Sequence, residues 1–380
     1  MKYEPYRATS MINRLRHVDD WFWASYTVNP YRGCAHGCVY CDARANQYGL
    51  SEDFEGTVFV KENAVEVLEK QLPRLKRGVV STGGVCDAYQ PIEQERRLTR
   101  KVVKALADHQ FPVEVLTKSD LVLRDLDLYA EASRESWACV FFTITTFDEQ
   151  IAGRFEPGAS PPDRRLEAMR QVAGAGVMTG VAMMPLLPGV TDGEDNIKDI
   201  ASRVRDAGGQ FVLGGGLTLK EGVQRNRYMD FLESHYPEAL PLYSQLYGSG
   251  FEPRGGYGPK LLRRVREICA QSGMSDRMSR PVLPGDSLAL NKRIAERLLL
   301  RTYDLFLEEA ENYRQWAYRK AAWAVDETEQ DVGAIYRQQG RKGLESIKGV
   351  GKRLSGEIED WLQSAEGSTP DRLKDDNEQR

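Results

Sequence analysis

Short apolar runs alternate with amphipathic segments from Ser25 to Leu217 of this 380-residue chain. The segments between the runs repeat apolar residues at helical spacing, whereas the runs have the length and composition of buried strands. Strands that alternate with helices form parallel sheets, so we predict an α/β fold whose sheet is curled or doubly wound. The six predicted strands are Ser25–Val28, Gly78–Gly84, Phe111–Ser119, Ala138–Thr146, Gly176–Pro185 and Gly209–Leu217.

The segments that follow these runs contain the residues best suited to binding and catalysis. They are the cysteine-rich loop after Val28, then GGVCDAYQPIE, TKS, TITTFD and PLLPGVTD. Parallel sheets bind their ligands at the carboxyl ends of the strands. We therefore expect these segments to meet on one face and to form a single active site.

Three of the six cysteines, Cys34, Cys38 and Cys41, lie within eight residues in NPYRGCAHGCVYCDAR. So few cysteines in a chain of this length do not form a secreted disulfide framework, which favours a reduced compartment and metal chemistry. Three thiolates can hold three irons of a cubane [4Fe–4S] cluster and leave the fourth open, whereas structural zinc needs four ligands. The alternatives are a Cys3His zinc site that uses His36, at a spacing that would strain a tetrahedron, and buried cysteines without a ligand.

The N-terminal sequence and the net charge indicate the cellular compartment and limit the possible binding partners. The N-terminal sequence MKYEPYRATSMINRLRHVDDW has no basic-then-apolar signal, and no later apolar run reaches the roughly 18 residues of a membrane span. We expect a soluble, cytoplasmic protein without a membrane partner. The net charge of -4 at pH 7 argues against a globally basic nucleic-acid binder, so any such binding must be local.

The cysteine spacing, with Tyr40 directly before Cys41, resembles the cluster loop of radical S-adenosylmethionine enzymes. NPYRGCAHGCVYCDAR, DAYQPIE, TKSDLVLRD, RFEPGASPPDRRLEAM and PLLPGVTD also resemble the spore photoproduct lyase-like, or DNA repair photolyase, branch over about Asn29–Gly250. The resemblance implies a partial (β/α)6 TIM-like barrel, a [4Fe–4S] cluster on the cysteines and S-adenosyl-L-methionine on the open iron. Reductive cleavage would yield a 5′-deoxyadenosyl radical, with the electron from a donor such as flavodoxin or ferredoxin.

Further cofactor contacts follow from the resemblance and from position in this fold. Lys118 would meet the cofactor carboxylate, and Tyr40 belongs to the same set. Thr143 and Thr145 share one side of the fourth predicted strand, where a ribose could accept their hydroxyls. The amino group would lie at the end of the second predicted strand, beside Ser81, Thr82, Gly83 and Gly84. The alternatives are that Lys118 is a solvated loop lysine, that the Tyr40 ring only packs, that the two threonines are buried strand residues without a ligand, and that Ser81–Gly84 is an ordinary turn.

Cys86 lies just past the second predicted strand, in GGVCDAYQ. In the branch that this chain resembles, a similarly placed cysteine donates a hydrogen atom to a substrate radical, so Cys86 is the candidate catalytic residue. The alternative is an inert buried thiol. Cys139 and Cys269 fall in apolar patterns and are interpreted as core residues. Glu156 is not assigned to the site, because it could equally form a loop ion pair.

The chain changes character at SRPVLPGDS, where two prolines and a glycine predict a break. Helical patterns alone follow, and the last residues are polar and charged. We predict a barrel with terminal extensions over residues 1–280, a linker over 281–288, an all-α domain over 289–364 and a disordered tail over 365–380.

The stretch GLESIKGVGKRLSGEIEDWL has apolar residues at helical spacing on both sides of KGVG. This pattern predicts a helix-hairpin-helix whose tight turn uses Gly349 and Gly351. The N–H groups that begin its second helix would attract a phosphate, helped by the helix dipole. Lys348, Lys352 and Arg353 add positive charge at this turn, which is the predicted nucleic-acid-binding site.

This helical domain resembles the N-terminal domain of family X DNA polymerases, with AYRKAA and IKGVGKRL as matching segments. Some members of that family carry a Schiff-base lysine where this chain has Glu357, and a carboxylate cannot form an imine. We therefore expect DNA binding through the backbone without that lyase activity. The alternatives are protein contacts and a packing role.

Together these features favour a radical enzyme that acts on DNA, by lesion repair or base modification. One alternative is a non-catalytic DNA-binding protein with a structural iron–sulfur or zinc centre. Another is a radical enzyme that acts on RNA, protein or a small molecule. The substrate and the oligomeric state have no signature in the sequence.

Overall fold

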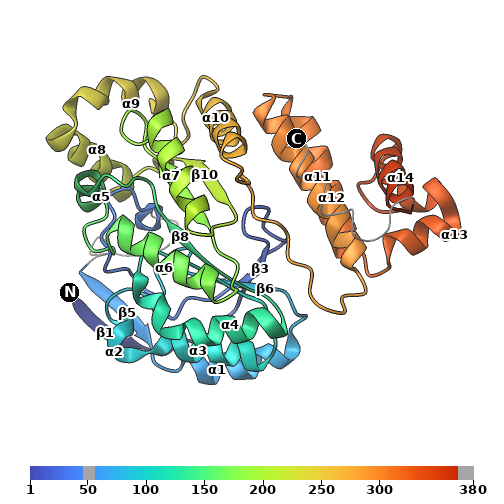
Figure 1. The fold of residues 1–380 in the computed structure, drawn as a ribbon, viewed down its shortest axis with the longest axis horizontal. Helices are drawn as coiled ribbons and strands as arrows, with labels where there is room; N and C mark the ends of the chain where they lie inside the picture. Colours follow the sequence, from blue (N-terminus) through green and yellow to red (C-terminus); the bar gives the residue numbers. More distant parts are fainter. Residues whose placement is uncertain (46–55, 367–380) are drawn as a thin grey trace. The chain divides into compact units, whose positions relative to one another are not determined.

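The computed structural model describes residues 1–45 and 56–366. The chain divides into two compact units, Met1–Ser279 and Arg280–Arg380. Figure 1 shows strands and helices in the first unit and helices in the second. The predicted tail lies outside the described residues, apart from its first two residues, which belong to the last helix, α14 (Lys352–Glu366).

The first unit is built on a seven-stranded sheet in the order β10-β9-β8-β7-β6-β3-β2. The strands within this sheet follow one another in chain order without a reversal, so the sheet curls in one direction as a partial barrel and is not doubly wound. Each of the six predicted runs overlaps one of the parallel strands. The strands are β2 (Asn13–Arg14), which is antiparallel to its neighbour, and β3 (Ala24–Thr27), β6 (Val79–Thr82), β7 (Val113–Thr117), β8 (Ala138–Thr143), β9 (Val181–Leu186) and β10 (Val212–Gly216).

Amphipathic helices pack against this sheet and bury its apolar side (Figure 1). Val113 and Val115 of β7 belong to the core that the helices share with the sheet. Side chains alternate along a strand, so Glu114 between them faces the other side of the sheet, as does its neighbour in register, Cys139. The helices are α1 (Ala64–Gln71), α3 (Leu98–Asp108), α4 (Leu126–Glu135), α6 (Pro162–Gly174), α7 (Glu194–Asp206) and α10 (Tyr257–Gln271).

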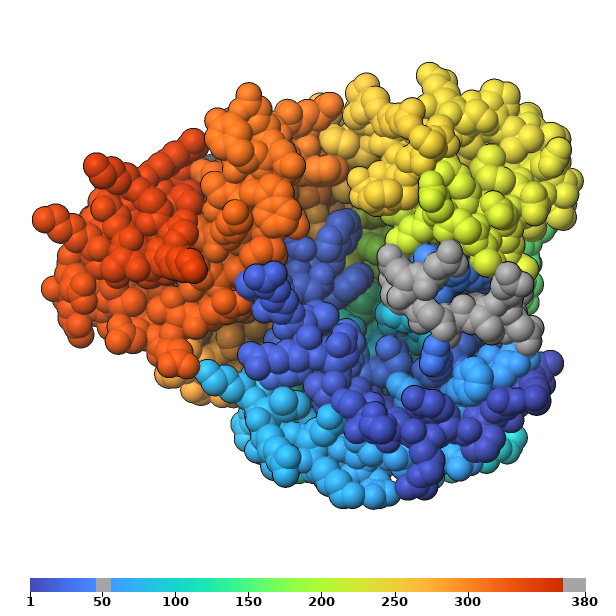
Figure 2. Space-filling view, turned by 180° about the vertical axis from the view of Figure 1, so that it is seen from behind, coloured from blue at the N-terminus to red at the C-terminus, as the bar shows by residue number. Residues whose placement is uncertain are grey.

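A second, three-stranded sheet holds the entry to the cysteine loop. Its central strand β5 (Thr57–Lys61) pairs in parallel with β1 (Lys2–Tyr6) and antiparallel with β4 (Tyr31–Arg32). Figure 2 shows residues of β1 and β5, dark and lighter blue, side by side on one face. None of the apolar runs in the sequence predicts this sheet. It matters for function because β4 leads directly into Cys34.

Further helices of the first unit are α2 (Glu93–Arg96), α5 (Glu149–Phe155), α8 (Val223–His235) and α9 (Leu240–Tyr247). The buried Gln224 of α8 donates a hydrogen bond to the Tyr40 carbonyl oxygen at 3.1 Å, and Lys220 pairs with Asp42 at 2.8 Å. This part of the chain therefore holds the end of the cysteine loop at Tyr40 and Asp42.

The second unit contains α11 (Ala289–Leu307), α12 (Asn312–Glu327), α13 (Val332–Glu345) and α14. The buried Asn291 of α11 accepts a hydrogen bond from Val332 N and donates to the carbonyl oxygens of Thr328 and Gln330. It thereby fixes the turn between α12 and α13. In the described part of both units, no helix combines the length and the apolar character needed to cross a membrane.

Candidate active site

The cysteine loop folds back on itself at the carboxyl end of β3. Cys34 and Cys38 are 8% and 7% exposed, and Cys41 is half-buried. Cys34 and Cys41 pack around Cys86, and Cys38 packs beside Tyr40. Burial raises the pKa of the Cys38 thiol to about 12, and the positive charge of Lys118 opposes this shift. The loop thus gathers the cysteines next to a cation that can balance thiolate charge.

The donor set fits a cubane cluster better than a zinc ion. In the described residues, no three His, Cys, Asp or Glu side chains converge closely enough to share one ion. His36, the fourth ligand of the zinc alternative, instead places Nδ1 3.3 Å from Asp87 Oδ2. In a cubane each cysteine binds a different iron, so the thiols need not converge on one point.

Asp87 joins three parts of the site. It accepts hydrogen bonds of 2.8 Å from Lys118 N, Tyr89 N and the Thr117 hydroxyl, in addition to its contact with His36. Burial alone would raise the pKa of Asp87, but His36 and these donors lower it to about 2. The segment after β6, the end of β7 and the cysteine loop are therefore held together by one buried carboxylate.

The end of β6 contains an orphaned polar atom. Thr82 is buried, and its hydroxyl has no hydrogen-bond partner among the described residues. Gly83 follows with φ +92°, and a Cβ there would overlap the carbonyl oxygen of Leu116, so only glycine fits. Ser81 and Gly84 flank these two residues. A buried hydroxyl without a partner suits the polar group of a bound cofactor.

Thr143 and Thr145 are both buried, but they do not share a strand. β8 ends at Thr143, and Thr145 lies in the bend that follows. The carbonyl oxygen of Thr145 accepts a hydrogen bond of 2.8 Å from Asn196. Simple alternation along one strand therefore does not describe this pair, because the chain leaves the sheet between them.

Glu156 and Arg165 form a buried ion pair that the sequence analysis does not assign. Arg165 Nη2 lies 2.5 Å from Glu156 Oε2, and the Tyr40 hydroxyl donates to Glu156 Oε1. Burial alone would raise the pKa of Glu156, but Arg165 and Lys118 lower it below its ordinary value. The only available sequence signal is that Glu156 and Arg165 both lie in RFEPGASPPDRRLEAM.

Lys118 lies at the centre of these contacts. Its ammonium group is 5.7 Å from the centroid of the Tyr40 ring. Burial would lower the pKa of Lys118, but Cys38 and Glu156 raise it above its ordinary value. The lysine therefore stays protonated and can meet a carboxylate. The structure brings Lys118, Tyr40 and the cysteine loop together, and their role as cofactor contacts stays a prediction.

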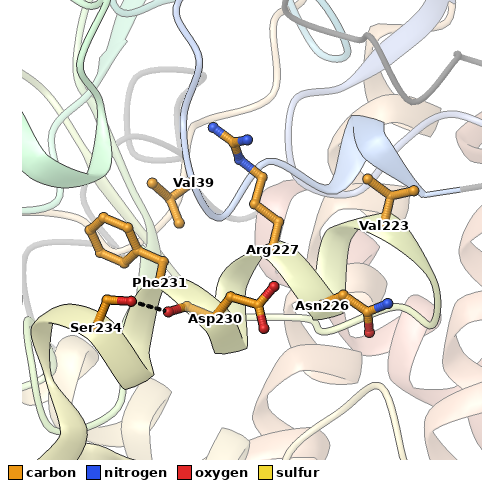
Figure 3. Close-up of a pocket in the computed structure, with 7 residues that line it drawn as sticks. All are labelled: Val39, Val223, Asn226, Arg227, Asp230, Phe231 and Ser234. Carbon is orange, nitrogen blue, oxygen red and sulfur yellow. Dashed lines mark hydrogen bonds between the residues drawn. The ribbon is translucent and has the colours of Figure 1, made fainter.

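A cavity of about 640 Å³ opens beside the cysteine loop (Figure 3). Val39 comes from that loop, and Figure 3 shows the Arg227 guanidinium extending toward it from α8. None of the predicted cofactor residues lines this cavity. Its remaining lining residues are Val223, Asn226, Asp230, Phe231 and Ser234.

The predicted nucleic-acid-binding residues form one exposed turn in the second unit. Gly349 has φ +94°, and α14 begins directly after Gly351. Nearby, Glu357 accepts hydrogen bonds from the Tyr318 hydroxyl and pairs with Arg353 at 3.1 Å. The exposed residues of this turn are Lys348, Gly349, Gly351, Lys352 and Arg353.

Comparison with known proteins identifies the family. The model of the radical SAM superfamily matches residues 28–201. An uncharacterized protein of Mycobacterium tuberculosis is 32% identical over 271 residues, which cover 70% of this chain and 79% of that protein. An uncharacterized protein of Methanocaldococcus jannaschii is 30% identical over 223 residues, which cover 58% of this chain and 80% of that protein.

Among solved structures, the chain is similar in fold to spore photoproduct lyase complexed with dinucleoside spore photoproduct. The TM-score is 0.54 at 17% identity, over 71% of this chain and 79% of that one. The partial barrel and the cysteine loop agree with these matches. The chain therefore belongs to the radical SAM superfamily, and its cofactors are a [4Fe–4S] cluster and S-adenosyl-L-methionine.

Proposed function

We propose that this radical SAM enzyme acts on DNA, by a lyase-like repair of a lesion or by modification of a base. The observation that carries the proposal is the exposed cationic turn at the start of α14, where Lys348, Lys352 and Arg353 flank two exposed glycines. This turn is suited to holding a phosphate backbone while the barrel performs the chemistry.

In this proposal α13, α14 and the turn between them are a helix-hairpin-helix. The first N–H groups of a helix have no partner inside it, and the dipole of the 15-residue α14 adds positive potential at that end. A phosphate meets both at an exposed glycine turn, and backbone contacts of this kind do not depend on base sequence. Residues 337–353 contain six basic residues and one acid, so the positive charge is local.

Glu357 favours binding without Schiff-base chemistry at this site. Its carboxylate already accepts hydrogen bonds of 2.7 and 2.9 Å from the Tyr318 hydroxyl. A carboxylate has no amine with which to attack an aldehyde. The second unit would therefore bind DNA and leave the reaction to the first.

In the barrel, we assign the cluster to the three cysteines of the loop and the cofactor carboxylate to Lys118. The amino group would lie by the end of β6, near the orphaned Thr82 hydroxyl, and the ribose by Thr143 and Thr145. When bound, the cluster and S-adenosyl-L-methionine supply a 5′-deoxyadenosyl radical, given one electron from a donor such as flavodoxin or ferredoxin. The residues themselves orient the cofactor and exclude water.

Cys86 is the proposed hydrogen-atom donor. It packs against Cys34 and beside the half-buried Cys41, so its thiol lies next to the cluster site. In the transfer, the S–H bond breaks as a C–H bond forms on the substrate, and the unpaired electron passes to sulfur. Spore photoproduct lyase, which shares this fold, has been solved with a dinucleoside, and this likeness supports a nucleic-acid substrate.

The experiment is DNA binding by the full chain, measured by fluorescence anisotropy at several salt concentrations. Lys348→Glu with Lys352→Glu should weaken DNA binding. It should also lower the steepness of a plot of log binding constant against log salt concentration by about 2, because each lysine that contacts a phosphate releases one counterion from the DNA. Lys70→Glu with Lys104→Glu, exposed lysines on α1 and α3, is the matched control. Equal DNA binding by the wild type and the Lys348→Glu, Lys352→Glu variant would contradict the proposal.

A further inference from the structure

We propose that the buried Glu156–Arg165 pair positions Tyr40, Lys118 and Thr143 as one unit for S-adenosyl-L-methionine. The inference rests on the cofactor contacts assigned in the proposed function. It adds Glu156 and Arg165, which act on the residues that bind the cofactor and do not bind the cofactor themselves. Glu156 and Arg165 lie near the two ends of the α5–α6 segment, which we define as residues 155–165.

The pair is costly to bury. Both side chains are 1% exposed, and Arg165 Nε has no hydrogen-bond partner among the described residues. A buried ion pair repays its desolvation only when its geometry is excellent and its remaining groups are satisfied, and apolar residues of similar size are often as stable. An imperfectly satisfied pair is therefore weak evidence for stability and stronger evidence for a role in geometry.

The first contact of the pair is with the cysteine loop. The Tyr40 hydroxyl donates to Glu156, and Val39 N donates to the Phe155 carbonyl oxygen at 2.8 Å. Gly158 N donates to the His36 carbonyl oxygen at 2.9 Å, and a Cβ on Gly158 would overlap the backbone of the loop. The α5–α6 segment therefore holds the loop on both sides of Cys38.

The second link, to Lys118, is indirect and runs through Tyr40 and through the backbone of the α5–α6 segment. The Lys118 ammonium group lies by the ring of Tyr40, a geometry in which the ring face attracts a cation. Because Glu156 fixes the hydroxyl of that ring, it also fixes the surface against which the ammonium rests. Ser160 N donates to the Lys118 carbonyl oxygen at 3.0 Å, so the same segment holds the lysine's backbone.

The third contact is with the end of β8. Arg165 Nη1 donates to the Thr143 carbonyl oxygen at 2.6 Å. This bond uses the backbone of Thr143 and leaves its hydroxyl for the ribose. Three cofactor contacts from three separate parts of the barrel are thus tied to one pair of charges, and their spacing is set together.

Two variants separate positioning from folding. Tyr40→Phe removes one hydroxyl and keeps the pair. Glu156→Met with Arg165→Met replaces both charges by apolar side chains and leaves no buried charge unpaired, so the fold should survive. Glu156→Gln alone is less useful, because it leaves Arg165 charged and buried. Glu167→Gln is the matched control, since Glu167 forms an exposed ion pair with Arg170 on the same helix.

The experiment measures cofactor binding and not turnover. Each variant is reconstituted anaerobically, its iron content and thermal midpoint are recorded, and the reduced cluster is titrated with S-adenosyl-L-methionine by electron paramagnetic resonance. Tyr40→Phe and the double methionine variant should each bind about tenfold more weakly at unchanged iron content, as expected when a supporting partner of a ligand is removed. Combining the two should cause little further loss, because the hydroxyl acts through Glu156.

Unchanged affinity in both variants, or losses that add in the combination, would overturn the inference. Lys118→Ala distinguishes this failure from a failure of the proposed function. If Lys118→Ala weakens binding and the other variants do not, the positioning role alone is wrong. If Lys118→Ala has no effect either, the assigned carboxylate contact is wrong.

Discussion

Charged side chains gather at the candidate sites in both units of the protein, but they are buried in the first unit and exposed in the second. Around the cysteine loop, Asp87, Glu156 and Arg165 are buried, and each holds several partners at fixed distances. At the start of α14, Lys348 and Lys352 are exposed. Buried partners fix geometry, whereas exposed charges attract from a distance and are screened by salt. The barrel should therefore depend on shape, and the helical unit on charge.

The largest effect should come from removing a cluster ligand. Cys38→Ala should abolish assembly of the [4Fe–4S] cluster, because the loop would then have only two thiolates for the three irons that its cysteines bind. Iron and sulfide content after anaerobic reconstitution provide the measurement. DNA binding by the same variant should be unchanged, because the residues assigned to it lie in the other unit.

Cys269→Ala is the control for this substitution. Cys269 is buried in α10 and outside the cysteine loop, so its loss should lower stability and leave the iron content unchanged. A Cys38→Ala protein that held the full iron complement would show that the cysteine loop is not the cluster site.

A narrower effect is expected from Cys86→Ala. This variant should assemble its cluster and form 5′-deoxyadenosine, but should change the identity of the DNA product, because the substrate radical lacks its hydrogen donor. Mass spectrometry of the digested DNA is the measurement. Turnover and products identical to those of wild type would remove Cys86 from the catalytic set and leave it as a packed thiol.

The smallest effect concerns Glu114, which is fully buried in the barrel. Neither carboxylate oxygen has a hydrogen-bond partner among the described residues, and burial raises the pKa of Glu114 well above its ordinary value of 4.5. As pH rises above 4.5 the unfolded chain releases this proton while the folded barrel keeps it. Wild type should then lose about 1.4 kcal/mol per pH unit from this residue until the folded group ionises.

Glu114→Gln should remove that loss. The gain in thermal midpoint of the variant over wild type should be larger at pH 8 than at pH 5, measured by calorimetry. Glu135→Gln, at the exposed end of α4, should show no such trend. A gain that did not vary with pH would mean that Glu114 is ionised in the folded barrel.

Local patterns predicted much of this architecture. The six parallel strands were predictable because each is a short apolar run between helical segments, and the gathering of Cys34, Cys38 and Cys41 in one loop because they are close in sequence. The small sheet of β1, β4 and β5 was missed, because β1 is mostly exposed and β4 is only two residues long, so neither is an apolar run.

Glu156 was left unassigned because its burial depends on partners that are far away in the sequence. Its partner Tyr40 is 116 residues away, and a carboxylate in a loop has no local signature of burial. The pattern that placed Thr143 and Thr145 on one strand failed at the point where β8 ends. Motifs indicate which residues react, but the residues that hold them in place are set by tertiary contacts.

The most direct test of the account is formation of 5′-deoxyadenosine by the reconstituted full chain. The protein is reduced with S-adenosyl-L-methionine in the presence of ultraviolet-damaged DNA, undamaged DNA or no DNA, and the product is measured by chromatography. We predict that 5′-deoxyadenosine forms and that DNA changes its yield. An iron-loaded protein that forms none under any of these conditions, or forms the same amount with and without DNA, would contradict it.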